Sequence, residues 1–338
     1  MKYRPHNYQQ YAADFILEHP VCCLMLDMGL GKTVITLSAL WELALDRFDI
    51  GKILVIAPKR VATDTWPKEL QKWEHLTGLT ASLVVGSQRK REDALARPAF
   101  LYIINRENVS WLVQNHRWDF DTVVIDELSS FKSNQAQRFK AMKKVRSLVN
   151  RVIGLTGTPA PNSLLDLWPQ MYLLDMGQRL GRFITGYRER FFTPDKRNRE
   201  IIYSYKPREG AEKAIYSLIS DICISMKAVD YLDMPECIYN RVEVEMNRKE
   251  RKIYDDFCRD MVVQIGEEEL DAVSAGALSN KLLQMANGAV YNSDGKVLPI
   301  HNRKLDALED LLEAAIGKPL LVAYWYKHDL SRIRERFP

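Results

Sequence analysis

The sequence lacks any hydrophobic run long enough to cross a membrane, and it also lacks a secretory signal. The longest apolar run, Val21–Leu26, has the length of a strand, whereas a membrane-spanning helix needs about 20 consecutive apolar residues. Residues 1–7 contain none of the apolar core of a signal peptide. The sequence therefore predicts a cytoplasmic protein without a membrane partner.

The cysteine content and the net charge are also low, and each limits the possible functions. The five cysteines, at positions 22, 23, 223, 237 and 258, form no C-x-x-C pair, so we expect reduced structural thiols and no zinc site. A net charge of +4 in 338 residues is too small by itself to indicate nucleic-acid binding. The composition, 46% hydrophobic and 27% charged, is typical of a globular protein, and the length fits roughly two domains.

Short apolar runs alternate with helical patterns over the first part of the chain. Such runs between helices are typical of a parallel sheet covered on both faces, which binds ligands at the carboxyl ends of its strands. We expect helices over residues 33–48, 65–75 and 136–148. The predicted strands are residues 21–26, 53–57, 81–85, 100–104, 122–125, 152–155 and 222–225.

The remainder of the chain has a different pattern. Residues 164–217 have a helical, basic pattern typical of an insertion or arm. Beyond it, residues 241–246 alternate like a strand, residues 320–325 are typical of a buried strand, and residues 292–295 of a hairpin turn. Helices are expected over residues 248–265, 277–286 and 304–315, with a last helix near Arg334.

Residues 179–208 combine many basic side chains with aromatic ones. Basic groups neutralise phosphates and aromatic rings stack on bases, so the stretch fits a nucleic-acid surface. A solvated helical face with core aromatics explains the same composition. The basic members are Arg179, Arg182, Arg188, Arg190, Lys196, Arg197, Arg199, Lys206 and Arg208, and the aromatic ones Phe183, Tyr187, Phe191, Phe192, Tyr203 and Tyr205.

A glycine-containing turn between a strand and a helix has the residues of a phosphate-binding loop. Its glycines allow backbone N–H groups to approach phosphates, and the helix start adds partial positive charge. Lys32 would reach the β- and γ-phosphates, and the Thr33 hydroxyl suits magnesium. Leu26 stands where the strict pattern has glycine, and a turn without a ligand is the competing interpretation. The segment is Asp27-Met28-Gly29-Leu30-Gly31-Lys32-Thr33.

Two carboxylates, Asp126 and Glu127, follow the apolar strand 122–125. Both would lie at the carboxyl edge of the sheet, beside the phosphate loop. Asp126 suits magnesium, and Glu127 suits orienting or deprotonating the attacking water. A charged strand end that caps the next helix is the alternative.

Three further segments accompany the phosphate loop and the acidic motif: Arg4-Pro5 followed by Tyr8-Gln9, then Ala57-Pro58-Lys59, and then Thr156-Gly157-Thr158-Pro159. Together these motifs resemble those of superfamily-two helicases, and their residues are most similar to the SWI/SNF-related translocase family of bacterial or phage type. Segments around residues 226–235, 251–254, 282–288 and 304–325 extend the resemblance over nearly the whole chain.

The resemblance implies two RecA-like lobes. Residues 1–230 would form the first, with a helical basic insertion at about 163–215. Residues 231–338 would begin the second, with a helical protrusion at about 247–300.

The resemblance further implies ATP and Mg²⁺ as cofactors, a monomeric motor, and DNA as partner, with duplex favoured over single strand. The resemblance implies that ATP is bound by Arg4, Gln9 and residues 28–33, with Gln9 at the adenine, and that magnesium is held by Thr33 and Asp126. The implied catalytic residues are Lys32, Asp126 and Glu127, and the residues implied to lie near nucleic acid are Pro58, Lys59, Arg60, Asn105, Arg106 and Lys132. Coupling between the two sites is implied for Ser129, Thr156, Gly157 and Thr158.

Two departures from the family pattern affect the expected activity. Ser129 stands where the family has a histidine that couples hydrolysis to the T-G-T-P segment, so we expect altered coupling. The sequence also stops before the family's later motifs, which carry an arginine that reaches the γ-phosphate. Such an arginine contributes roughly 10³–10⁵ in rate, so we expect this chain alone to hydrolyse ATP weakly.

Four functions fit these features to different extents. A duplex-DNA translocase explains the most segments. A strand-separating helicase, or the motor of a restriction or recombination complex, shares the same motifs. A nucleotide- and DNA-binding module with little turnover would follow from an incomplete second lobe. A kinase-like phosphate-loop enzyme leaves the T-G-T-P segment and the basic stretch unexplained.

Overall fold

The computed structural model describes residues 1–157, 160, 163–196, 202–232, 238–266, 268–315 and 318–337. They divide into two compact units, Met1–Pro235 and Glu236–Pro338. Thr158 of the predicted coupling segment, and Arg197 and Arg199 of the basic stretch, lie outside the described residues. Among the described residues, no helix is long and apolar enough to cross a membrane.

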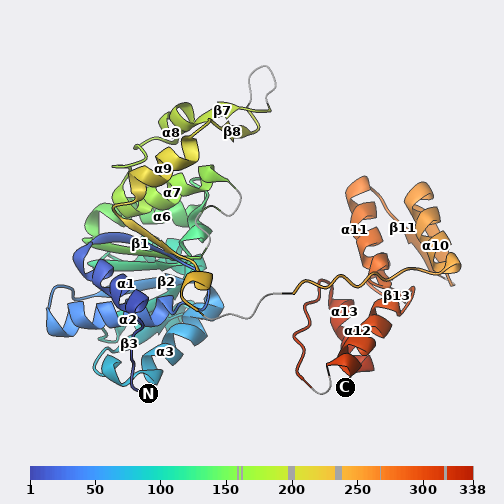
Figure 1. The fold of residues 1–338 in the computed structure, drawn as a ribbon, viewed down its shortest axis with the longest axis horizontal. Coiled ribbons are helices and arrows are strands. Elements are labelled where there is room, and N and C mark those ends of the chain that lie inside the picture. Colours follow the sequence, from blue (N-terminus) through green and yellow to red (C-terminus); the bar gives the residue numbers. More distant parts are fainter. Residues whose placement is uncertain are drawn as a thin grey trace. The chain divides into compact units, whose positions relative to one another are not determined.

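Unit 1 is built on one sheet flanked by helices (Figure 1). The sheet has seven strands in the order β3-β4-β2-β5-β6-β1-β9, and every neighbouring pair is parallel. All seven strands that the apolar runs predict are present, so the predicted α/β class is confirmed. Their bounds are β1 (Val21–Leu26), β2 (Ile53–Ala57), β3 (Ala81–Val84), β4 (Leu101–Asn105), β5 (Thr122–Asp126), β6 (Arg151–Thr156) and β9 (Cys223–Met226).

Helices cover both faces of this sheet because successive side chains of each strand point to opposite sides. Leu24 and Leu26 of β1 belong to one apolar cluster, whereas Cys23 and Met25 belong to the other. The first cluster is closed by α1 (Asn7–Glu18), α2 (Lys32–Trp41) and α3 (Trp66–Lys72). The second is closed by α4 (Gln88–Ala96), α5 (Val109–Asn115), α6 (Gln137–Val145), α7 (Leu167–Asp175), α8 (Ile184–Phe191) and α9 (Ala211–Ile219).

Short helical turns connect these elements, and two of them are π-helical. The helix predicted over residues 33–48 corresponds to α2 followed by the π-helical turn η1. The helix predicted over residues 65–75 corresponds to α3, which follows the π-helical turn η2. The turns are η1 (Glu42–Asp46, π), η2 (Val61–Thr65, π), η3 (Glu74–Leu76), η4 (Arg106–Asn108), η5 (Leu128–Phe131), η6 (Arg146–Leu148), η7 (Leu164–Asp166) and η8 (Ala228–Asp230).

The helical arm predicted over residues 164–217 contributes helix α7 and several aromatic rings to the core, although most described residues of the basic stretch 179–208 are exposed or half-buried. Helix α7 is buried along almost its whole length, and Tyr187, Phe191 and Phe192 lie in the apolar cluster of that face. These three rings are therefore not available to stack on bases, and that part of the prediction was wrong. Phe183 and Tyr203 are exposed. The outer part consists of α8 and a hairpin of β7 (Phe192–Pro194) with β8 (Tyr205–Pro207) (Figure 1).

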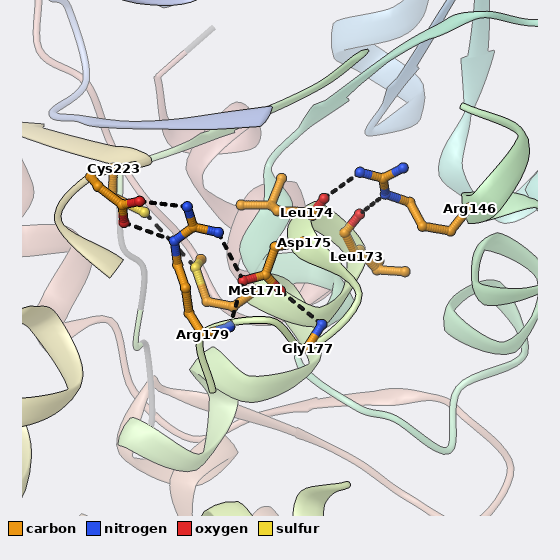
Figure 2. A network of polar contacts seen from close by, with 9 residues as sticks. Arg146, Met171, Leu173, Leu174, Asp175, Gly177, Arg179 and Cys223 are labelled. Carbon is orange, nitrogen blue, oxygen red and sulfur yellow. Dashed lines mark hydrogen bonds and ion pairs between the residues drawn. The ribbon is translucent and has the colours of Figure 1, made fainter. Parts of the chain in front are cut away.

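Arg179, the first basic member of that stretch, is held in an ion-pair network (Figure 2). Its guanidinium Nε donates to Asp221 at 2.7 Å, and Nη1 donates to Asp175 at 3.3 Å. Nearby, the buried Arg146 donates to the carbonyl oxygens of Leu173 and Leu174 and so fastens the end of α7. Because its donors are engaged by carboxylates, Arg179 is a structural residue rather than a phosphate ligand.

Unit 2 has its own small core, in which Phe257, Leu270, Met285, Val290 and Leu298 are buried. The hairpin turn predicted at residues 292–295 is confirmed. The elements are α10 (Arg248–Asp260), β10 (Val262–Ile265) paired with β11 (Glu268–Asp271), α11 (Ala275–Ala286), β12 (Ala289–Tyr291) paired with β13 (Val297–Pro299), α12 (Arg303–Ala314) and α13 (Lys327–Arg336).

Three predictions for unit 2 were wrong. The helix predicted over 248–265 ends at Asp260, because Met261 takes the left-handed conformation (φ 57°) and β10 pairs with β11 from there. Residues 241–246 and 320–325 are not strands. A strand needs neighbours for its backbone N–H and C=O groups, and no described residue of unit 2 pairs with either segment. Leu321 and Trp325 are accordingly exposed rather than buried.

Candidate nucleotide site

The phosphate loop lies where β1 ends and α2 begins, at the carboxyl edge of the sheet. Gly29 (φ 87°) and Gly31 (φ 83°) both take the left-handed conformation that glycine adopts at little cost. Leu30 is fully buried and anchors the loop, whereas Met28 is 83% exposed. Leu30 therefore fixes the loop to the core while Met28 is exposed to solvent, and α2 begins directly after the glycines, at Lys32.

Lys32 lies in the loop with its amino group folded onto the end of β1. Its Nζ donates to the carbonyl oxygens of Leu26 at 2.7 Å and Asp27 at 3.2 Å. Burial lowers the pKa of Lys32, while the carboxylates of Asp126, Glu127 and Asp27 act in the opposite direction. The amino group of Lys32 therefore lies close enough to the carboxylates of Asp126 and Glu127 to interact with both electrostatically.

Asp126 ends β5 and is almost completely buried. Its Oδ2 accepts a hydrogen bond from the indole Nε1 of Trp66 at 2.8 Å, and its Oδ1 accepts one from the backbone N–H of Glu127 at 3.0 Å. Burial raises the pKa of Asp126, and these two hydrogen bonds oppose that shift. Sequence reasoning missed Trp66, because nothing in its local pattern connects it with a carboxylate 60 residues away.

Glu127 takes a backbone conformation that is uncommon for a residue with a side chain. Its φ of 56° lies in the left-handed region, and such strain is frequent at functional sites. The Oγ of Ser129 donates to Oε1 of Glu127 at 2.9 Å. Ser129, at the position of the family's histidine, therefore contacts the proposed catalytic carboxylate directly.

The coupling segment reaches the loop through β6, which lies beside β1. Thr156 is buried and in register with Met25. Gly157 follows at the strand end, where an added Cβ would lie 3.7 Å from Nζ of Lys32 and 3.4 Å from the carbonyl oxygen of Leu26. Three strands thus bring Lys32, Asp126 and Gly157 to one edge of the sheet.

Gln9 packs against the same loop. Its Nε2 donates to the carbonyl oxygen of Leu30 at 3.3 Å, and its Oε1 accepts from the backbone N–H of His6 at 3.0 Å. A Cβ on Gly31 would lie 2.7 Å from that Nε2, so glycine is required for this close approach. Arg4, predicted to bind ATP with Gln9, is exposed on the chain just before α1.

The residues predicted to contact nucleic acid follow β2, β4 and β5, which are neighbours in the sheet. Lys59, Arg60 and Lys132 are exposed, and Pro58 is half-buried. Asn105 and Arg106 differ, because Nδ2 of Asn105 donates to Glu107 at 2.8 Å and Nε of Arg106 donates to the same side chain at 3.0 Å. Asn105 and Arg106 are thus both hydrogen-bonded to the exposed carboxylate of Glu107.

The donor set fits a magnesium nucleotide. Thr33 lies in the first turn of α2, and each carboxylate oxygen of Asp126 has one hydrogen-bond donor and further acceptor capacity. Space around Gly29 is open, since an added Cβ there would meet no atom within 4 Å. Carboxylate and hydroxyl oxygens are the ligands that Mg²⁺ prefers.

Comparison with known proteins shows the family. The chain matches the family model described as "SNF2-related domain" over residues 8–292. It is 35% identical over 345 residues to "Putative protein p41" of Acyrthosiphon pisum secondary endosymbiont phage 1, covering 99% of this chain and 75% of that protein. It is 26% identical over 303 residues to "Uncharacterized ATP-dependent helicase MG018" of Mycoplasma genitalium, covering 88% of this chain and 27% of that protein.

Among solved structures, the fold is similar to that described as "Sulfolobus solfataricus SWI2/SNF2 ATPase core in complex with dsDNA". The TM-score is 0.57 at 22% identity, and the match covers 94% of this chain and 65% of that one. The likeness shows a RecA-like core fold. The chain thus spans a little under two thirds of the archaeal core and about a quarter of the Mycoplasma helicase.

Proposed function

The chain belongs to the SNF2-related domain family of helicase superfamily two, and from that premise we propose that it is a motor that hydrolyses ATP to act on duplex DNA. The observation that carries the proposal is the position of the Lys32 amino group. It lies within electrostatic range of Asp126 and Glu127 and against Gly157, at the carboxyl edge of one parallel sheet.

Each proposed residue has a distinct task in this site. Lys32, with the backbone of residues 28–31, would hold the phosphates, and Thr33 with Asp126 would hold magnesium. Bound magnesium would neutralise phosphate charge during phosphoryl transfer. Glu127 would orient and deprotonate the attacking water, and Arg4 and Gln9 would contact the base.

We place the nucleic-acid partner along the ends of β2 and β5. Lys59, Arg60 and Lys132 are exposed there, and backbone-directed contacts of this kind carry no sequence readout. A motor that must release and regrip along any sequence needs such contacts. Pro58, Asn105 and Arg106 would shape this edge, and Ser129, Thr156, Gly157 and Thr158 would connect it to the nucleotide. Supporting this partner, the archaeal core of similar fold is described in complex with dsDNA.

We further propose that residues 1–230 are the first RecA-like lobe and residues 231–338 the start of a second, with the helical protrusion at about 247–300. A second candidate function, a nucleotide- and DNA-binding module with little turnover, is favoured by one observation. The described residues of unit 2 contain two small hairpins and no parallel sheet, so they do not supply a second RecA-like face for the nucleotide.

The test is steady-state ATPase activity without nucleic acid and with duplex DNA, single-stranded DNA or RNA. Duplex DNA is expected to stimulate most. Glu127→Gln is expected to lower the rate by about 10²-fold or more while nucleotide still binds, and Lys32→Ala to weaken nucleotide binding itself. An unchanged rate in both variants would refute the assignment of the site.

Two further measurements separate the candidates. A tailed-duplex displacement assay is expected to show no strand separation if the chain translocates on duplex. Comparison with a longer chain containing a complete second lobe is expected to show faster DNA-stimulated hydrolysis. Equal rates in both chains would overturn the expectation of weak turnover, and nucleotide binding without any hydrolysis would favour the binding module.

A further inference from the structure

Trp66 makes a contact that the proposed chemistry does not explain. It is the first residue of α3 and is completely buried, and its indole N–H donates to Oδ2 of Asp126 at 2.8 Å. A buried indole N–H needs an acceptor, and here the acceptor is the carboxylate proposed to hold magnesium. The chain supplies that donor from 60 residues before Asp126.

The contact restricts the orientation of the Asp126 carboxylate. The other oxygen, Oδ1, accepts the backbone N–H of Glu127 at 3.0 Å, so each oxygen has one fixed donor. A carboxylate held by donors on both oxygens cannot rotate without breaking a charge-assisted hydrogen bond in a buried site. Its remaining acceptor capacity therefore points in a fixed direction before any ligand arrives.

Trp66 also directly follows residues 58–65, the segment that carries the exposed side chains of Lys59 and Arg60. Residues 58–65 run from the end of β2 through the π-helical turn η2, which is closed by the backbone N–H of Trp66 donating to the carbonyl oxygen of Val61. Ala62 and Trp66 are both fully buried in the cluster beneath α2. Single π-helical turns are rare and are frequent at functional sites.

We propose that Trp66 is a positioning residue, which orients the Asp126 carboxylate for magnesium and links it to the nucleic-acid contacts at Lys59 and Arg60. Movement of residues 58–65 on binding nucleic acid would be transmitted to Asp126, because Ala62 and Trp66 are fully buried in one apolar cluster and the indole donates to Oδ2 of Asp126 at 2.8 Å. This inference rests on the proposed function, since it requires Asp126 to hold the magnesium of the nucleotide.

The test uses the full chain and the variant Trp66→Phe, which keeps an aromatic ring and removes the N–H donor. The readout is the magnesium concentration that gives half-maximal binding of a fluorescent ATP analogue, measured with and without duplex DNA. The matched control is Trp73→Phe, because the Nε1 of Trp73 also donates to a carboxylate, that of Glu69 at 2.6 Å, at the other end of the same helix.

Trp66→Phe is expected to raise the magnesium midpoint roughly tenfold, the effect of losing one hydrogen bond to a charged group. It is also expected to reduce the shift that duplex DNA produces in that midpoint. Trp73→Phe is expected to change neither by more than about twofold. An unchanged midpoint in Trp66→Phe, or an equal rise in both variants, overturns the inference.

A double-mutant cycle distinguishes positioning from packing. In the Asp126→Asn background, Trp66→Phe is expected to add less than about twofold, because both changes remove the same function. Full additivity overturns the inference. Thermal melting checks folding, and Trp66→His, which retains a ring N–H, is the second variant, expected to recover part of the magnesium affinity. If the parent chain shows no magnesium-dependent nucleotide binding, the proposed function itself fails.

Discussion

Ser129 stands where the resemblance to the family predicts a histidine in the nucleotide site. Its hydroxyl donates to Glu127 at 2.9 Å, and its side chain is buried. The bond holds one oxygen of a carboxylate whose backbone is already in the left-handed region. Ser129 therefore makes a positioning contact of its own with the proposed catalytic carboxylate.

Ser129→Ala is expected to lower the DNA-stimulated ATPase rate more than the basal rate. Loss of one hydrogen bond to a charged group costs about 1.5–3 kcal/mol, which is roughly tenfold or more in rate if it acts only on the stimulated state. The measurement is ATPase activity over a duplex-DNA titration. Equal proportional losses with and without DNA would contradict a coupling role.

At the scale of elements, the outer part of unit 1 carries the remaining basic side chains. Arg182, Lys196 and Lys206 are exposed on or near α8 and the β7–β8 hairpin, whereas Arg179 is paired with Asp221 and Asp175. Charges without such pairing are the ones able to release counterions from DNA phosphates. The hairpin therefore remains a proposed nucleic-acid surface with fewer members than its composition indicates.

Replacing Arg182, Lys196 and Lys206 by alanine is expected to weaken duplex binding. The dependence of log affinity on log salt concentration is expected to become shallower by up to about one unit for each DNA phosphate that the variant no longer neutralises. Fluorescence anisotropy over a salt series measures both. Arg89→Ala on α4, also exposed, is the control. An unaltered salt slope in the triple variant would exclude the hairpin as a phosphate-binding surface.

Helix α13 of unit 2 contains a buried histidine, His328, from whose environment we expect an acid-sensitive stability of this unit. The imidazole of His328 is buried and packs against Tyr326 and Tyr291, with ring centroids at 5.4 and 5.1 Å. Burial lowers the pKa of His328, which outweighs the attraction of Asp329, 3.1 Å from Nδ1. The contact with Asp329 is within ion-pair distance but lacks hydrogen-bond geometry, so neither ring nitrogen has a hydrogen-bond partner among the described residues.

In the unfolded chain this histidine takes up a proton near pH 6.5, whereas in the folded unit its pKa is lower. The resulting stability is therefore present above about pH 6.5 and is lost as the pH falls through the lower folded-state pKa. His328→Phe, which keeps a ring of similar shape, is expected to flatten the loss of unit 2 stability between about pH 7 and 5. Thermal melts across that range test it, and an identical pH profile in the variant would count against this assignment.

At the scale of the whole molecule, the two units have separate cores. Unit 1 has an apolar cluster on each face of its sheet, and unit 2 has one small cluster. Unit 2 also exposes Leu321 and Trp325, and its apolar groove of about 460 Å³ is lined in part by Val242, Leu308 and Tyr324. A small core with exposed apolar residues stabilises a unit less than a complete two-faced sheet does.

Calorimetry is expected to show two unfolding transitions, with unit 2 melting first. Magnesium nucleotide binds the native state of unit 1 in the proposed function, so it is expected to raise only the upper transition. At about 100-fold excess over Kd the stabilisation would be about 2.7 kcal/mol. Lys32→Ala is the control, because it should abolish that shift. One cooperative transition would contradict the independence of the units.

The seven strands and the positions of the two site motifs could be predicted from the sequence, because both are local. An apolar run between helical patterns marks each of these seven strands, and two glycines, a lysine and a threonine in order mark the predicted phosphate loop. The tertiary structure alone decided which distant groups meet. It placed the indole of Trp66 against Asp126, paired Arg179 with Asp221, buried three aromatic rings of the predicted arm, and left residues 320–325 without a neighbouring strand. Such interactions depend on residues far away in the chain, which no local pattern specifies.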